Sequence, residues 1–297
     1  MHLVLSQKMI TMSQEETEET RGIIRTILFA LCFINRSIVN RIAARLAPGN
    51  HIFLIGNSLG ANLIVKYLGE EGLSNTLPKC VAGGVSLGNP LKINSGNLKF
   101  PWGQVLGLGV KKSIFLNRKS FRDMKCVSEA YHKALRALTV GETDNILAPY
   151  FIRNESLYPY ATKIGYASGE EYWKDASSYQ YVPHISVPLL KISAQDDFLV
   201  HRNALAKLAD CLYNPNIIVA KTKSGGHLGW SEAVGLRSVL FGASWADKAT
   251  TEFIDAVLQL KREGKDMESC LSSSALLNVK QVIMQAQHES NSLRSRL

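Results

Sequence analysis

Residues 51–72 read HIFLIGNSLGANLIVKYLGEEG. They open with a short apolar run, residues 52–55, of the kind that forms a strand buried on both faces of a sheet. The pattern G-x-S-x-G follows, with Ser58 between Gly56 and Gly60, and apolar residues then recur at helical spacing up to Gly72. A sharp turn between a strand and a helix exposes the serine hydroxyl at the positive end of the helix. Ser58 is therefore a candidate nucleophile, and an ordinary strand–helix turn is the alternative.

Two further segments place polar side chains just after an expected strand. The run 187–194 leads to Asp196 and Asp197, and the run 217–220 leads to a glycine-lined turn that holds His227. A serine hydroxyl is a weak nucleophile until a histidine takes its proton, and a carboxylate orients that histidine. Ser58, Asp197 and His227 are thus a candidate triad, with the backbone N–H of Leu59 as one oxyanion donor. Asp196 competes for the acid role. Asp197 is favoured because it has the D-x-x-V spacing in which a helix follows the acid.

The other segments divide the chain into three parts. Residues 1–47 form a divergent N-terminal segment, in which four glutamates precede a helix expected at 21–46. Residues 48–262 form one α/β domain, with a further strand at 80–87 and helices at 203–212 and 244–260. A cap insertion interrupts this domain at about 92–170; we expect it to be helical at 120–138 and irregular from there to 169. Residues 263–297 form a polar, serine-rich tail that we expect to be flexible.

The composition indicates which kinds of partner the protein could bind and which redox compartment suits it. The five cysteines form no C-x-x-C pair, which argues against a zinc site or a disulfide framework and for a reducing compartment. The net charge is +9, and ten Lys or Arg stand against two acidic residues between Lys92 and Arg136. An anionic membrane surface would suit such a cap, and a solvated helical face is the alternative. We expect no nucleic-acid partner. The longest apolar run, residues 27–34, is too short to span a membrane.

Five blocks carry a family resemblance: residues 56–63 (GNSLGANL), 171–178 (EYWKDASS), 193–197 (SAQDD), 225–230 (GGHLGW) and 244–247 (SWAD). In this order they resemble the embryogenesis-associated (YheT-like) branch of abhydrolase-domain proteins, with similarity over about residues 42–262. The resemblance implies an α/β-hydrolase fold, a Ser58/Asp197/His227 triad, and no metal or organic cofactor. It also implies a serine esterase or lipase that acts on carboxylic esters such as acylglycerols. Related acyltransferases share the triad, so acyl transfer stays open.

The segment before residue 48 departs from that branch. Its members carry an H-G-L-T-G-G-type loop that supplies the other oxyanion N–H, often after a membrane anchor. Here the only glycines before Gly56 are Gly22 and Gly49. We therefore expect an apparently truncated chain whose N-terminal strands are largely missing, so that the strand at 52–55 lacks a neighbour on one flank. A bare edge promotes aggregation, and a lost oxyanion donor slows turnover by about 10²–10³. A poorly soluble, catalytically impaired form is accordingly a further alternative.

Overall fold

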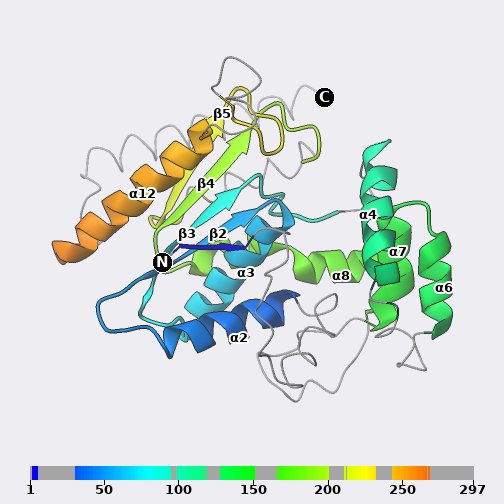
Figure 1. Cartoon of the computed structure of the whole chain (residues 1–297), viewed down its shortest axis with the longest axis horizontal. Coiled ribbons are helices and arrows are strands. Elements are labelled where there is room, and N and C mark those ends of the chain that lie inside the picture. The colour runs from blue at the N-terminus through cyan, green and yellow to red at the C-terminus, as the bar shows by residue number, and fades with distance from the viewer. Residues whose placement is uncertain are drawn as a thin grey trace, which may run out of the picture.

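The strands form one parallel sheet in this computed structural model, which describes residues 2–5, 31–94, 98, 100–116, 118, 128–150, 166–200, 211, 213–231, 243–265 and 267. The strands are β1 (His2–Leu5), β2 (Ile52–Asn57), β3 (Val81–Leu87), β4 (Leu189–Ala194) and β5 (Ile217–Thr222), and they pair in the order β1-β2-β3-β4-β5 (Figure 1). Each adjacent pair is parallel. Parallel strands end at a common edge, so the loops after β2, β3, β4 and β5 meet there.

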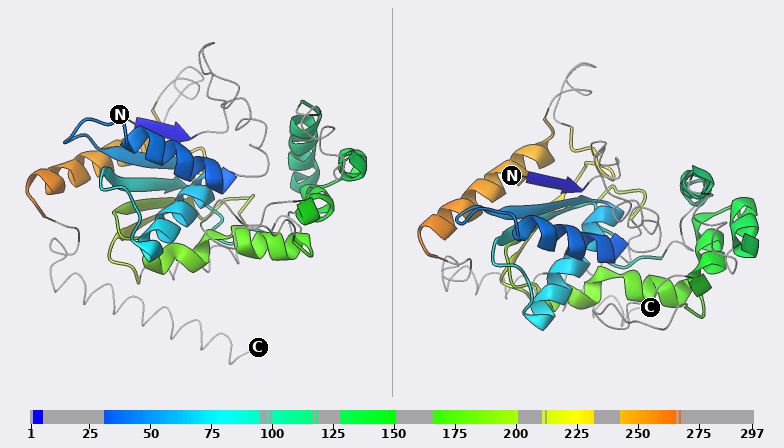
Figure 2. Two further views of the ribbon diagram at one scale, coloured as in Figure 1. Left: turned by 90° about the horizontal axis from the view of Figure 1, so that it is seen from below. Right: turned by 60° about the horizontal axis from the view of Figure 1, so that its bottom comes forward.

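Helices cover both faces of the sheet (Figures 1 and 2). On one face lie α2 (Leu31–Ala43), α3 (Leu59–Ser74) and the 3₁₀ segment η4 (Ser178–His184), and on the other lies α12 (Trp245–Arg262). Because α3 is packed between the sheet and η4, small residues are needed along it. A Cβ on Gly69 would lie 2.3 Å from the carbonyl oxygen of Tyr181. The predicted α/β-hydrolase class is confirmed by this layered parallel sheet.

The cap insertion has an apolar core of its own. It contains α4 (Trp102–Leu116), α6 (Ser128–Arg136), α7 (Val140–Leu147) and the short 3₁₀ segment η3 (Ala148–Tyr150), and α8 (Gly169–Ala176) leads back toward the sheet (Figure 1). Ile114 of α4 and Ala134 of α6 are completely buried in this core, together with Leu147 of α7. The domain boundaries proposed from the sequence stay predictions.

The structure corrects the expectation of a bare flank beside β2. His2–Leu5 forms β1 and pairs in parallel with β2, with Leu3 opposite Leu54 and Val4 opposite Ile55. This stretch lies in the divergent N-terminal segment 1–47, for which the sequence predicts no strand. A four-residue edge strand has too few residues to show a period, and its place is set by pairing with β2.

A second correction concerns the cap. Residues 139–169 were expected to be irregular, but α7 and η3 lie within them. Thr139 is the N-cap of α7: its side chain accepts the backbone N–H of Glu142, and the Glu142 carboxylate accepts that of Leu138. The T-x-x-E spacing is a recognisable N-terminal signal that the sequence analysis missed. The expected helices at 203–212 and 120–138 are described only at Cys211 and from 128 onward, and most of the 263–297 tail lies outside the described residues.

Candidate active site

The turn that carries Ser58 has the strained geometry expected from G-x-S-x-G. Ser58 has φ 53° and ψ −120°, in the left-handed half of the map that residues with a Cβ rarely occupy. A Cβ on Gly56 would lie 2.5 Å from the carbonyl oxygen of Gly60, so β2 and the first turn of α3 approach too closely for any side chain there. The Ser58 N–H donates to the carbonyl of Leu87 at the end of β3. Ser58 is thereby fixed at the carboxyl edge of the sheet.

The structure brings the three predicted side chains together. Ser58 Oγ lies 2.7 Å from Nε2 of His227, and Nδ1 of the same ring lies 2.9 Å from Oδ2 of Asp197. The other carboxylate oxygen of Asp197 accepts the backbone N–H groups of Leu199 and Val200, at 2.9 and 3.0 Å. The Asp197 side chain is only 2% exposed and that of His227 13%. These contacts can pass a proton from the serine to the imidazole and hold the ring in one orientation.

The Asp196 side chain points to the glycine-lined turn just ahead of His227. Its carboxylate accepts the backbone N–H of Gly226 at 2.9 Å and that of Gly225 at 3.3 Å. On the other side, the indole of Trp230 lies against Gly225, where a Cβ would be 2.4 Å from the ring. The indole N–H donates to the Thr222 hydroxyl at 2.9 Å. Asp197 therefore contacts the imidazole of His227, whereas Asp196 contacts the backbone just ahead of it.

Buried polar side chains tie the site to the elements beneath it. Asn62 accepts the N–H of Ser178 and donates to the carbonyl of Ala176, which joins the start of α3 to the end of α8. Lys191, in the middle of β4, donates to the Ser193 hydroxyl at 2.8 Å, and burial lowers the pKa of this lysine to about 8. Lys191 is not among the residues predicted from the sequence, since a charged residue in an apolar run gives no local sign of whether it is buried.

Each member of the Ser58–His227–Asp197 arrangement is followed by a large, exposed apolar residue. Leu59 follows the serine, Phe198 the aspartate and Leu228 the histidine, with exposures of 36, 55 and 44%. The ring of Trp102, at the start of α4, lies 4.5 Å from that of Phe198. The surface around the serine is therefore apolar, and α4 contacts it directly.

Leu59 is the first residue of α3, and the first N–H groups of a helix have no partner within the helix. Its role as an oxyanion donor stays a prediction. The expected loss of the other donor, which an H-G-type loop would supply, stays a prediction as well. Within the described part of the chain, no cluster of His, Cys, Asp and Glu could hold a metal ion. No described helix is long and apolar enough to cross a membrane.

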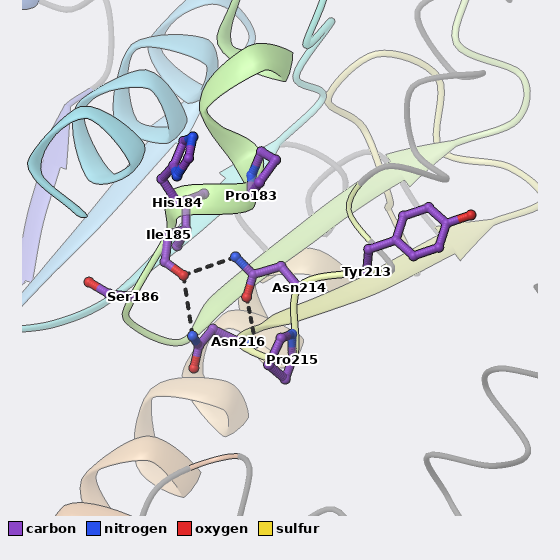
Figure 3. A pocket seen from close by; sticks show the side chains of 8 residues that line it. All are labelled: Pro183, His184, Ile185, Ser186, Tyr213, Asn214, Pro215 and Asn216. Atoms are coloured by element: carbon purple, nitrogen blue, oxygen red, sulfur yellow. Dashed lines mark hydrogen bonds between the residues drawn. The ribbon is translucent and has the colours of Figure 1, made fainter. Parts of the chain in front are cut away.

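A cavity of about 510 Å³ lies at the opposite end of the sheet (Figure 3). It is lined by residues 183–186 and 213–216, which precede β4 and β5. Its amides are engaged within the protein: Asn214 donates to the carbonyls of Val182 and Ile185, and Asn216 donates to Ile185 as well. This cavity is therefore separate from the serine, which lies at the carboxyl ends of the strands.

Comparison with known proteins gives several relatives, although no protein-family model matches the chain. A monoacylglycerol lipase of Saccharomyces cerevisiae is 31% identical over 207 residues, which cover 66% of this chain and 41% of the relative. Monoacylglycerol lipase ABHD2 of Danio rerio is 30% identical over 234 residues, which cover 73% of this chain and 50% of the relative. Embryogenesis-associated protein EMB8 of Picea glauca is 28% identical over 230 residues, which cover 74% of this chain and 45% of the relative. The chain is thus similar to the embryogenesis-associated branch of abhydrolase-domain proteins.

The chain spans about half the length, or less, of the curated relatives it matches. Among solved structures, it is similar to the monoacylglycerol lipase of Paleococcus ferrophilus. The TM-score is 0.40 at 14% identity, over 77% of this chain and 75% of the other. The resemblance drawn from the five sequence blocks is confirmed by the curated relatives.

Proposed function

We propose that this protein is a serine-dependent hydrolase of lipid carboxylic esters that acts through an acyl-enzyme on Ser58. The observation that carries the proposal is the hydrogen-bonded series Ser58–His227–Asp197 at the carboxyl edge of the sheet. Two observations support a lipid ester as the substrate. The relatives include proteins named monoacylglycerol lipase, and the three side chains that follow the triad residues are apolar and exposed.

The proposed reaction has two halves. Ser58 Oγ attacks the ester carbonyl while His227 Nε2 takes the hydroxyl proton, and the Leu59 N–H faces the oxyanion that forms. Collapse breaks the bond to the alcohol, which leaves with the proton from His227, and the acyl group stays on Ser58. Water then attacks the acyl-enzyme and gives a proton to His227; the bond between the acyl group and Ser58 Oγ breaks, His227 returns the proton to Oγ, and the free acid leaves. Asp197 stabilises the imidazolium that forms in each half.

The test is covalent labelling of the full chain with a fluorophosphonate, followed by turnover of a monoacylglycerol. We expect Ser58 to be labelled, Ser58→Ala to abolish labelling, and His227→Ala to lose as much, because triad members act as a unit. Ser186→Ala removes an exposed serine beside the far cavity and is the matched control. Full turnover in Ser58→Ala would contradict the proposal. Adding a small alcohol separates hydrolysis, which gives free acid, from acyl transfer, which gives a new ester.

We also propose that the cap meets an anionic membrane surface through α4. Val105, Leu108 and Phe115 are 49, 63 and 53% exposed on this helix, and Lys112 is exposed in the same row. Residues spaced by three and four lie on one helical face. Apolar side chains flanked by lysines suit the boundary between acyl chains and acidic headgroups. Since Trp102 of α4 contacts Phe198 beside Asp197, this face adjoins the apolar surface around Ser58.

A further inference from the structure

Lys191 is a buried cation with no part in the reaction described above. It lies in β4 between Leu190 and Ile192 and is 1% exposed. Removing an ammonium group from water is costly unless other groups compensate for the lost hydration. Lys66, which is equally buried, forms an ion pair with Glu70 at 3.0 Å. Lys191 instead donates to a carbonyl and a hydroxyl, so its contacts and its location need a separate explanation.

The contacts of Lys191 lead to the loop behind His227. Its Nζ donates to the carbonyl of Asn89 at 3.2 Å and to the Ser193 hydroxyl at 2.8 Å. Asn89 follows Gly88, which packs against the histidine: a Cβ on Gly88 would lie 2.6 Å from the His227 carbonyl oxygen and 3.5 Å from its Cε1. The ammonium group thus holds the loop against which His227 rests.

The same loop reaches the serine. The side-chain amide of Asn89 donates to the carbonyl of Ala61 at 3.3 Å, and its oxygen accepts the N–H of Leu91 at 2.7 Å. Ala61 lies in the first turn of α3 and donates its own N–H to the carbonyl of Ser58. Through Asn89, Lys191 therefore joins β4 to the loop after β3 and to the start of α3.

We propose that Lys191 is a positioning residue whose buried ammonium group fixes the Asn89 loop behind His227. The catalytic meaning of this inference rests on the proposed function of Ser58. The effect on His227 itself does not, because it can be measured in a chain that hydrolyses nothing.

The experiment is an NMR spectrum of the full chain with ¹⁵N-labelled histidine, in which His227→Gln assigns the His227 signals. In Lys191→Met, which keeps the length but removes the donor to Asn89, we expect the His227 signals to move and broaden, because the loop behind the ring is released. Ser193→Ala removes one acceptor but keeps the donor to Asn89, so the signals should stay in place. If Lys191→Met does not fold, Lys191→Leu removes the same donor and should move the signals too. Unchanged His227 signals in the folded variants without the donor would overturn the proposal.

Fluorophosphonate labelling of Ser58 separates this inference from the proposed function. If wild-type Ser58 is labelled, Lys191→Met should lower the labelling rate about tenfold, whereas Ser193→Ala should keep the wild-type rate. If wild-type Ser58 is not labelled, the proposed function fails, and the His227 signals still decide the role of Lys191.

Discussion

At the scale of single residues, the two neighbouring carboxylates of Asp196 and Asp197 hold the histidine in different ways. Asp197 is buried and binds the imidazole, whereas Asp196 is exposed and binds backbone N–H groups of Gly225 and Gly226. Substitution by Asn should therefore affect the two positions unequally. An amide at 197 can present an N–H to Nδ1 and stabilise the wrong tautomer, whereas an amide at 196 keeps an oxygen for Gly226.

We expect Asp197→Asn to lower the rate of Ser58 labelling by about 10⁴, the scale known for the acid of a serine triad. Asp196→Asn should lower the labelling rate about tenfold or less, since it weakens hydrogen bonds to the turn and leaves the partner of the imidazole intact. The measurement is the labelling rate of each variant, with circular dichroism to verify folding. Equal losses, or the larger loss in Asp196→Asn, would exchange the two roles.

How much the sequence predicts also depends on the residue. The turn at Ser58 is a local pattern: glycines two residues away on each side, an apolar strand before it and a helix after it, so it was predictable. The contacts of Lys191 were not predictable, because its ammonium group donates to Asn89, more than a hundred positions earlier in the chain. The Trp102–Phe198 contact likewise joins the cap to the Asp197 loop over a long separation that no local periodicity records.

At the scale of elements, α4 combines exposed apolar side chains with basic ones. The structure also refines the charge count that suggested a membrane partner. Lys133 of α6 forms an ion pair with Glu129 at 2.7 Å, so part of the positive charge of the cap is neutralised locally. Lys111 and Lys112 lie on α4 among the exposed apolar residues, which makes α4 the helix to test.

We expect binding to vesicles with anionic lipid to exceed binding to neutral vesicles, and to weaken as salt rises through roughly 0.1–0.5 M, because the Debye length shortens. Lys111→Glu with Lys112→Glu should remove most of the difference, and Leu108→Ser with Phe115→Ser should lower binding to both kinds. Lys261→Glu with Arg262→Glu on α12 makes the same change in net charge and is the control. Co-sedimentation measures all of these. An equal loss of vesicle binding in the control pair would mean that net charge alone, and not α4, accounts for the binding.

At the scale of the whole molecule, β1 decides whether the sheet has an open flank beside the strand that carries Ser58. In the structure, β1 pairs with β2 and is itself the outermost of the described strands on that side. The neighbour of β2 thus comes from residues near the start of the chain, about fifty positions away from it. Sequence reasoning could not place this strand because pairing, not an internal period, determines its location.

Proline substitutions in β1 test this pairing, because consecutive residues of a strand direct their N–H groups to opposite sides. In Leu3→Pro and Val4→Pro, only one of the two variants removes an N–H that donates to β2; the other removes one that faces outward. We expect one variant to lower the unfolding free energy by about 1–2 kcal/mol and to aggregate, since it uncovers the edge of β2, and its neighbour to behave like the wild type. Thermal unfolding and light scattering distinguish the two. If both variants remained monomeric with the wild-type midpoint, β1 would contribute nothing to the edge, and the flank beside the Ser58 strand would be open as the sequence had indicated.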